Sequence, residues 1–487
     1  MNINRTFKIL NVTKVGLGLV TLLALTLLTS CGDDDGGMES PTNDILEIAD
    51  ANNDLTFLVT ALGKFPNLET TLSDESGSYT VFAPTNAAFA ALLEATGQTD
   101  LDDIPEDVIR RVLEYHVVAG ATLLSTDLTD GQTASTVLGE TIQVGVSGTS
   151  VTINGANVTT ANVEASNGVV HIIDGILVPS LEASILNTVV EPAYFNTDFS
   201  FLTDAVITAG LLNTLIDQSA DLTVFAPTDD AFRAAGITSL DGLTADDLTP
   251  ILQYHVLGSE VKAADLPATG SAVTTLNGDF YLSINSDGVF INGSTEVVAT
   301  DLDYDNGVVH VIDRTLMPPS SNVVEIAVAA STATEAEFGQ LVAALTAVEN
   351  DANAANLITA LSDASGSFTV FAPTDAAFQA LYTLAGVSDF AGLIALEGVD
   401  LNTIATVLQY HVLQGRVFSS DLPNVLDGGM TATITPLAGG TFTLNSSLTL
   451  TDVDGVLSLG TSDATIVDTD ILGTNGVIHV INQVILP

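Results

Sequence analysis

The chain has 487 residues, of which 46% are hydrophobic and 14% are charged, so it carries enough apolar side chains for several folded domains. Its 60 acidic residues far outnumber its 10 basic residues, and the formal net charge at pH 7 is −50. Such a surface repels phosphate groups, and this excludes nucleic acids and anionic membrane surfaces as binding partners.

Residues 1–30 have the pattern of a lipoprotein signal peptide. A basic start precedes an apolar stretch over 15–28, which is too short to be a membrane-spanning helix. The segment ends in Leu-Thr-Ser-Cys, which resembles the lipobox of bacterial lipoproteins. This resemblance implies that Cys31, the only cysteine, becomes the lipidated first residue of an exported outer-membrane lipoprotein.

Residues 31–43 are rich in Gly and Asp and contain few apolar side chains, so we expect a flexible acidic tether. The three aspartates at 33–35 also resemble the acidic export signal that follows the lipidated cysteine in some bacterial surface lipoproteins. A plain spacer and an export signal both fit this run. With the export signal the protein is exposed on the cell surface, which is the localisation that we expect.

The first part of the chain after the tether predicts a strand followed by helices. The β-branched and aromatic run 80–82 predicts a strand that Pro84 ends, because proline has no amide hydrogen for a ladder. Thr85 is the expected N-cap of a helix over 86–95. The apolar spacing predicts a second helix over 105–114.

Short strands follow these helices. Strand-like runs over 142–146, 151–153 and 158–163 alternate with turns, and the Asn-Gly dipeptide at 154–155 predicts a hairpin turn. The run 169–173 is apolar on both faces, as expected for a central strand that is covered on both sides. Helices followed by strands predict an α+β fold.

Three motifs occur three times each, in the same order. Thr-Val-Phe-Ala-Pro-Thr starts at residues 80, 223 and 369, Tyr-His at 115, 254 and 410, and Asn-Gly-Val-(Val/Ile)-His at 167, 306 and 475. The spacing of the last two motifs is longer in the third copy, and we expect the extra residues around 448–463. The repeats predict three tandem domains with short proline-stiffened joints. Their expected ranges are 44–181, 182–320 and 321–487.

The first and third motifs resemble the two signature segments of the fasciclin domain, with the Tyr-His pair between them. The resemblance covers nearly the whole chain after the tether. It implies that each copy is a β-sandwich wedge with packed helices, and that the protein works in adhesion. In fasciclin-type proteins the Tyr-His segment has been connected with receptor adhesion, so the resemblance implies a candidate adhesion segment in each copy. Its residues are Tyr115, His116, Tyr254, His255, Tyr410 and His411.

All six histidines lie in the repeated motifs; those outside the Tyr-His pairs are His171, His310 and His479. Because the same framework positions recur in every copy, we expect buried, hydrogen-bonded imidazoles rather than catalytic bases. For the tyrosines, contact with a partner and packing at the helix-to-strand junction both stay open.

The sequence contains no motif that indicates catalysis or a bound metal. Gly-x-Ser-x-Gly, His-x-x-x-His, Cys-x-x-Cys and P-loop sequences are all absent. Residues 301–307 superficially resemble a calcium loop, but Asn306 and Ile312 stand where such a loop needs Gly and Glu. We expect a polar turn before a strand there. The sequence therefore predicts no enzyme, no catalytic or metal site and no cofactor, apart from weak surface calcium.

These features together predict a lipid-anchored surface protein that binds other cells, a matrix or surface polymers, with homophilic contact as a further option. Tandem copies support this function, because linked weak sites gain avidity. The alternative is an accessory lipoprotein that captures a glycan or a small apolar ligand. The absence of Trp speaks against strong stacking on a sugar ring.

Overall fold

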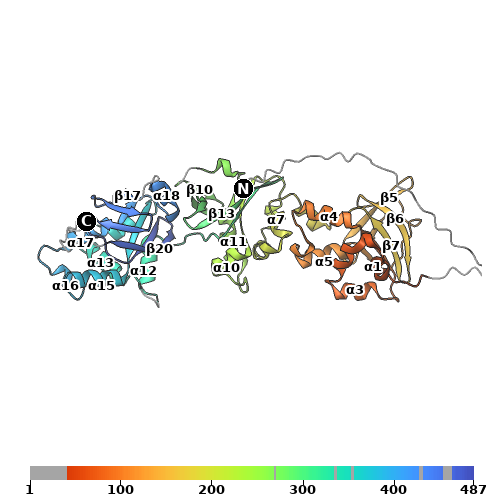
Figure 1. Ribbon diagram of the computed structural model, residues 1–487, viewed down its shortest axis with the longest axis horizontal. Helices are drawn as coiled ribbons and strands as arrows, with labels where there is room; N and C mark the ends of the chain where they lie inside the picture. The colour runs from red at the N-terminus through yellow and green to blue at the C-terminus, as the bar shows by residue number, and fades with distance from the viewer. Residues whose placement is uncertain (1–40, 268–269, 334–336, 352–355, 427–430, 453–462) are drawn as a thin grey trace, which may run out of the picture.

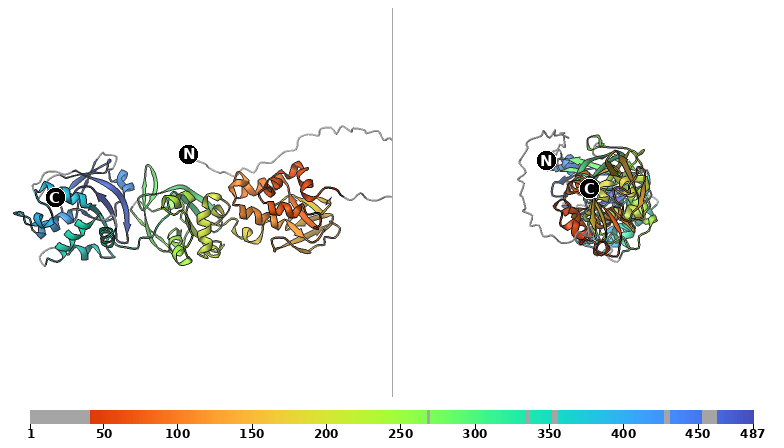
Figure 2. Two further views of the ribbon diagram at one scale, coloured as in Figure 1. Left: turned by 90° about the horizontal axis from the view of Figure 1, so that it is seen from below. Right: turned by 90° about the vertical axis from the view of Figure 1, so that its right-hand side faces the viewer.

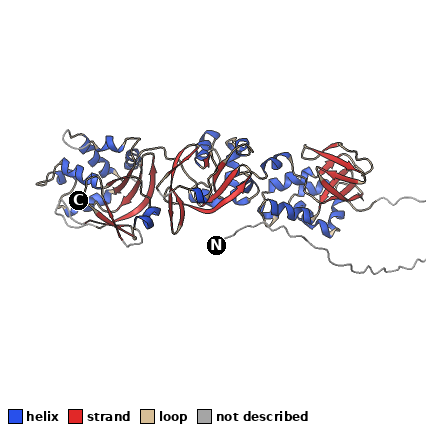
Figure 3. Cartoon of the chain, turned by 90° about the horizontal axis from the view of Figure 1, so that it is seen from above, coloured by secondary structure: helices blue, strands red, loops and turns tan. Residues whose placement is uncertain are grey.

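The computed structural model describes residues 41–267, 270–333, 337–351, 356–426, 431–452 and 463–487. They form three units in a row, each with helices packed against strands (Figure 1, Figure 2 and Figure 3). Each unit contains one seven-stranded sheet. The expected α+β architecture with three copies of one fold is confirmed.

The expected signal peptide, Cys31 and most of the expected tether lie outside the described residues. Within the described ranges, no helix is both long enough and apolar enough to cross a membrane.

In the first unit the sheet order is β2-β1-β7-β6-β5-β4-β3. The central strands β1 and β7 are parallel, and the other neighbours are antiparallel. The strands are β1 (Tyr79–Pro84), β2 (Val117–Ala119), β3 (Thr133–Ser135), β4 (Thr141–Ser147), β5 (Ser150–Ile153), β6 (Ala156–Ala165) and β7 (Gly168–Ile173). The helices are α1 (Ile45–Asp50), η1 (Asn53–Leu55), α2 (Thr56–Leu62), α3 (Pro66–Leu72), α4 (Asn86–Ala95), η2 (Leu101–Asp103) and α5 (Glu106–Tyr115).

The second unit repeats this topology in the order β10-β11-β12-β13-β14-β8-β9. Its strands are β8 (Leu222–Pro227), β9 (Val256–Leu257), β10 (Ala272–Thr275), β11 (Gly278–Asn285), β12 (Gly288–Ile291), β13 (Thr295–Tyr304) and β14 (Gly307–Ile312). Its helices are α6 (Ser180–Ile185), α7 (Glu191–Tyr194), η3 (Thr197–Phe199), α8 (Ser200–Thr208), α9 (Leu212–Leu215), α10 (Asp229–Ala234), α11 (Ala245–Tyr254) and η4 (Ala263–Asp265).

The third unit has the order β16-β15-β21-β20-β19-β18-β17. Its strands are β15 (Phe368–Pro373), β16 (Val412–Gln414), β17 (Thr431–Ile434), β18 (Phe442–Asn445), β19 (Thr449–Asp452), β20 (Ala464–Gly473) and β21 (Gly476–Ile481). Its helices are α12 (Val323–Ser331), α13 (Gly339–Glu349), α14 (Leu357–Leu361), α15 (Asp375–Leu384), α16 (Phe390–Ile394), α17 (Leu401–Tyr410), η5 (Ser419–Asp421) and α18 (Leu422–Val425).

Local signals in the sequence account for the ends of these elements. The amide of Ala88 donates to Thr85 Oγ1 at 3.3 Å, so the expected N-cap of α4 is confirmed. The turn between β5 and β6 places Asn154 at φ 47° and Gly155 at φ 91°, as the predicted hairpin requires. The corresponding strands of the third unit, β19 and β20, are joined by residues 453–463. The expected insertion lies at this connection, and most of it falls outside the described residues.

Both faces of the central strand β7 are buried, as predicted. Val170 belongs to the core between the sheet and the helices, whereas Ile173 belongs to a second core enclosed by the strands themselves. The Gly of the Asn-Gly-Val motif allows this strand to approach β1, because a Cβ at Gly168 would lie 2.1 Å from the carbonyl oxygen of Tyr79.

The first joint between units is a shared core. Tyr194 of α7 and its C-cap Phe195 pack in the core cluster of the first unit, whereas Ala193 of the same helix packs in that of the second. Arg111 of α5 donates through Nε to Glu182 Oε1 at 2.6 Å, and Glu182 is fully buried. Hydrogen bonding to Glu182 raises the pKa of Arg111. The expected boundary at 181/182 falls within α6, and the ranges of the three domains stay a prediction.

The second joint is built around another of the few basic residues. The guanidinium of Arg416 lies 4.3 Å from the ring centroid of Tyr281 in β11, and its Nη1 donates to the tyrosine hydroxyl at 2.8 Å. Asn285 Nδ2 also donates to the Ser420 carbonyl at 2.6 Å. These contacts tie the sheet of the second unit to the third unit.

Candidate functional site: the repeated tyrosine–histidine segments

Each Tyr-His pair lies at a junction between a helix and an edge strand. Tyr115 is the last residue of α5, His116 is its C-cap, and β2 begins at Val117. The same arrangement joins α11 to β9 and α17 to β16. β2, β9 and β16 are at one end of their sheets, so this junction sets the position of a sheet edge in every unit.

Both ring nitrogens of His116 are hydrogen-bonded inside the protein. Nδ1 lies 2.7 Å from the Val112 carbonyl oxygen, and the amide of Leu177 donates to Nε2 at 2.9 Å. Since Nε2 accepts, the proton is on Nδ1 and the imidazole is neutral. The other units repeat the pattern: His255 bonds to Ile251 O and Leu316 N, and His411 bonds to Val407 O and Ile485 N.

Burial lowers the pKa of His116, His255 and His411 to about 4 each. An imidazole with this pKa and both nitrogens occupied has no free lone pair for proton abstraction at neutral pH. The expectation that these histidines are buried, hydrogen-bonded groups is therefore confirmed.

The tyrosines of the pairs also face the interior. The Tyr115 hydroxyl donates to the Thr141 carbonyl at 3.0 Å and accepts from Asn154 Nδ2 at 2.9 Å. Tyr254 bonds in the same way to the Asp279 carbonyl and to Asn292 Nδ2. Tyr410 donates to the Thr441 carbonyl at 2.8 Å. Burial raises the pKa of Tyr254 to about 12. In the first two units the tyrosine thus ties its helix to the hairpin Asn, a link that is not predictable from the sequence pattern.

The second set of histidines uses the opposite tautomer. His171 Nε2 lies 2.8 Å from the Leu123 carbonyl oxygen, and the amide of Asn162 donates to Nδ1 at 3.4 Å. The same two contacts occur at His310 and His479. These imidazoles are also buried, as expected.

The polar turn that we expect within residues 301–307 lies at Asp305 and Asn306, directly before β14, whereas the first part of the run belongs to a strand. Asp301 lies within β13, at a bulge where the pairing with β14 shifts, and has φ 59°. Asn162 and Asp470 occupy the same bulge in the other units, with φ 58° and 64°. The left-handed conformation turns the amide toward the histidine, while the side chain of Asp301 accepts from the Ala263 amide. Because its first residues are strand, the run does not form a calcium loop.

The residues with defined placement contain no group of three or more His, Cys, Asp or Glu side chains that is arranged to hold a metal ion.

Two further motif residues hold each unit together and were not singled out from the sequence. Asn167 accepts from the Ile45 amide at 3.1 Å and donates to the Leu72 carbonyl at 2.6 Å. Thr80 donates to the Ala121 carbonyl and accepts from the Leu123 amide, both at 2.9 Å. The signal that points to them is their threefold recurrence, because equivalent bonds occur in the other units.

Comparison with known proteins accounts for this repeated framework. The family model described as "Fasciclin domain" matches residues 53–179, 197–318 and 340–487. The chain belongs to the fasciclin-domain family. The three matches correspond to the three sheets, so each unit is a fasciclin domain.

Among the relatives of these fasciclin domains is transforming growth factor-beta-induced protein ig-h3 of Sus scrofa, which is 28% identical over 445 residues. That match covers 91% of this chain and 57% of the relative, so the chain spans little more than half of that protein's length. Protein sll1483 of Synechocystis is 40% identical over 137 residues, covering 28% of this chain and 74% of that protein.

Among solved structures, the fasciclin-domain pair of the insect cell adhesion molecule fasciclin I covers 54% of this chain and 96% of its own. It has 20% sequence identity and a TM-score of 0.25.

Proposed function

We propose that this protein is a lipid-anchored adhesin, held by Cys31 to the outer face of the outer membrane and binding other cells, matrix or surface polymers through its fasciclin domains. The observation that carries the proposal is the array itself. Three units in a row each present the same edge strand beside a Tyr-His pair. Three weak, linked contacts of this kind bind more tightly than one.

The contact surface that we propose lies on the outer side of the Tyr-His segments. In each unit the backbone amide of one apolar residue donates to the carbonyl of the edge-strand residue that follows the histidine. The side chain of this apolar residue is exposed to solvent. These residues are Val137, Leu276 and Leu437, with exposed fractions of 39%, 51% and 46%. Water-exposed apolar side chains at one repeated position suit an interface more than a core. In this proposal Tyr115, His116 and their counterparts are positioning residues that hold the edge from behind.

Replacing the three exposed residues tests this surface. Beads coated with the chain from residue 41 onward should lose most of their adhesion to cells or matrix when Val137, Leu276 and Leu437 are all changed to Ser. Val298 and Val467 are the matched control, because they are 54% and 57% exposed but lie in β13 and β20. Their change to Ser should leave adhesion unchanged. Adhesion of the triple variant at the level of the unchanged chain would contradict the proposed surface.

The acidic charge predicts how this adhesion depends on ions. Two surfaces with a net charge of −50 per chain repel, and salt screens this repulsion over about 8 Å near physiological ionic strength. Calcium bridges carboxylates through oxygen ligands without a preformed loop, which is the weak surface binding that we expect. Bead adhesion should therefore rise with sodium chloride and, more steeply per ion, with millimolar calcium. Tight adhesion in chelator that does not change with salt would contradict the electrostatic part of the proposal.

A further inference from the structure

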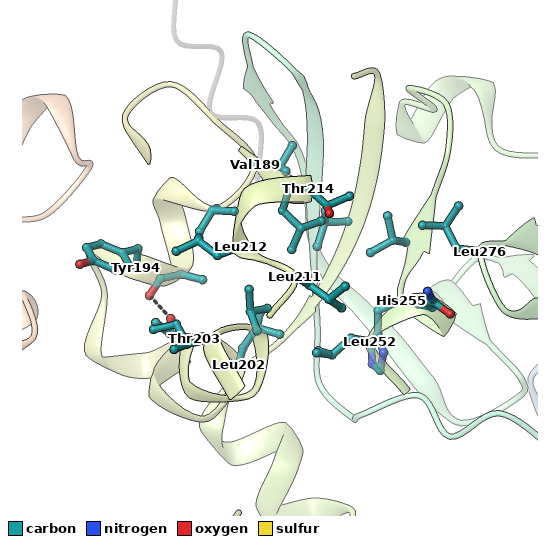
Figure 4. Close-up of a pocket in the computed structure, with 18 residues that line it drawn as sticks. Val189, Tyr194, Leu202, Thr203, Leu211, Leu212, Thr214, Leu252, His255 and Leu276 are labelled. Atoms are coloured by element: carbon teal, nitrogen blue, oxygen red, sulfur yellow. Dashed lines mark hydrogen bonds between the residues drawn. The ribbon is translucent and has the colours of Figure 1, made fainter. Parts of the chain in front are cut away.

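The second unit has an apolar groove that is larger than the equivalent space in the third unit. It is a cavity of about 90 Å³ between α7, α8, α9 and the strands β8 and β9. Figure 4 shows Leu202, Leu211, Leu212 and Leu252 around it, with Leu276 on one side and Tyr194 on the other. The equivalent space in the third unit has a volume of about 30 Å³.

Two substitutions in α8 open the groove. The helices of the three units can be aligned because the amides of Phe57, Phe201 and Gln340 donate to the equivalent side chains of Asn86, Asp229 and Asp375. In this alignment Val206 corresponds to Leu62 and Leu345, and Ile207 corresponds to Gly63 and Thr346. The smaller valine leaves space in the interior, and the exposed Ile207 extends the apolar surface to the rim.

The leucines over the groove are uncovered as a consequence. The carbonyls of Leu72, Leu215 and Leu361 accept from the Asn of the repeated motif, so these leucines are equivalent. Leu72 and Leu361 are buried, whereas Leu215 is half-buried. Leu211, at the preceding helical turn, is likewise half-buried where its counterparts are buried. The second unit therefore exposes apolar side chains whose counterparts are buried in the other two units.

The lining identifies the chemistry of the occupant. It consists mostly of aliphatic side chains and contains no Lys, Arg, Asp or Glu. The polar groups deep in the groove are already bonded: Thr203 Oγ1 donates to the Ala193 carbonyl at 3.0 Å, and both His255 nitrogens have partners. At the rim, Gln253 and Thr214 are uncharged. A carboxylate would find no cation here and would be repelled by the acidic chain.

We propose that this groove binds a single alkyl chain carried by a neutral head group. An engineered apolar cavity of about 150 Å³ binds benzene, so the closed part of this groove suits a short run of methylenes, with the rest lying along the open leucines. The groove lies beside the joint with the first unit, where Tyr194 is packed, and pockets at such junctions are common ligand sites. Leu276 lies at this groove and also in the proposed adhesion surface, but the argument for an alkyl ligand does not rest on adhesion.

Calorimetric titration of the chain from residue 41 onward with 1-hexanol, 1-heptanol and 1-octanol tests it. We expect one saturable site per chain, a negative heat-capacity change, and a dissociation constant that falls about fourfold per added methylene. Octanoate, which differs from 1-octanol in its charged head, should bind at least tenfold more weakly. Absence of a saturable site for 1-octanol, or equal binding of octanoate, would overturn the proposal.

Substitutions copied from the sister units provide the matched variants. Val206→Leu restores the residue of the first and third units and should weaken 1-octanol binding at least tenfold while leaving the melting temperature equal or higher. Val190→Leu, which copies Leu46, fills the same groove from the N-cap of α7 and is a second variant should the first fail to fold. Leu345→Val should open a second site in the third unit.

Two outcomes decide against an alkyl ligand. Unchanged 1-octanol binding by both filled variants would place the binding elsewhere. Dimers of the unchanged chain in sedimentation that Val206→Leu converts to monomers would make the groove a contact between copies of this chain.

Discussion

The buried histidine at each helix-to-strand junction predicts a specific loss of stability in acid. His116 is neutral in the folded chain, because burial lowers its pKa to about 4 and both ring nitrogens are bonded. In the unfolded chain its pKa is about 6.5, so below that pH the unfolded state binds a proton that the folded state does not. The stabilisation is complete above about pH 6.5 and is lost as the pH falls toward 4.

The size of this effect follows from the difference between the two pKa values. At about pH 5 the imidazole is protonated in the unfolded chain but not in the folded one. This protonation lowers the free energy of unfolding by about 2 kcal/mol relative to about pH 7.5. His116→Ala leaves the buried Leu177 amide without its partner, which costs about 1–3 kcal/mol at neutral pH. The variant has no imidazole to protonate. The stability gap between the two chains should therefore close by about 2 kcal/mol between these pH values.

Hydrogen exchange of the intact chain, read peptide by peptide, measures this gap. At about pH 7.5 the Leu177 amide should exchange at least about fivefold faster in His116→Ala than in the unchanged chain. At about pH 5 the two exchange rates should be nearly equal after correction for intrinsic rates. The equivalent amides of Leu316 and Ile485 are internal controls, because their histidines are unchanged. A gap that is equal or larger at about pH 5 would refute a neutral, buried imidazole.

Three further predictions concern the joint, the sheet and the anchor. Arg111→Ala should lower the melting temperature strongly, because unpairing the buried Glu182 costs about 3–5 kcal/mol, whereas changing both residues to Met should recover most of the loss. Gly168→Ala should destabilise the first domain, because the added Cβ would collide with the Tyr79 carbonyl, and limited proteolysis should then cleave this domain selectively. Resistance to the protease equal to that of the unchanged chain would contradict the close approach of β1 and β7. Cys31→Ala should move the protein from the membrane fraction to the soluble fraction or leave it unprocessed, and a cleaved variant that still partitions into detergent would disprove the anchor.

Most of the fold could be predicted from the sequence, because its signals are local. The β-branched run before Pro84, the cap at Thr85 and the Asn-Gly turn at 154–155 each act within a few residues, and the structure follows them. The threefold recurrence of the motifs also predicted that the chain has three units. It also indicated that the histidines are framework groups, since a catalytic imidazole has no reason to recur at one structural position in every copy.

Only the tertiary structure decided which contacts these residues make. The partners of His116 and Asn167 lie far along the chain, at Leu177 and Leu72, and hydrophobic periodicity carries no information about such pairs. The bulge at Asp301 was not predicted, because polar residues with positive φ are common in turns as well as in bulges.

The groove of the second unit could not be predicted from the sequence either. Valine and leucine are equivalent in an apolar pattern, yet one missing methylene at Val206 leaves leucines uncovered. The size of a cavity depends on the volumes of the side chains around it. The apolar pattern from which the fold is predicted shows only which side chains are apolar, not how large they are.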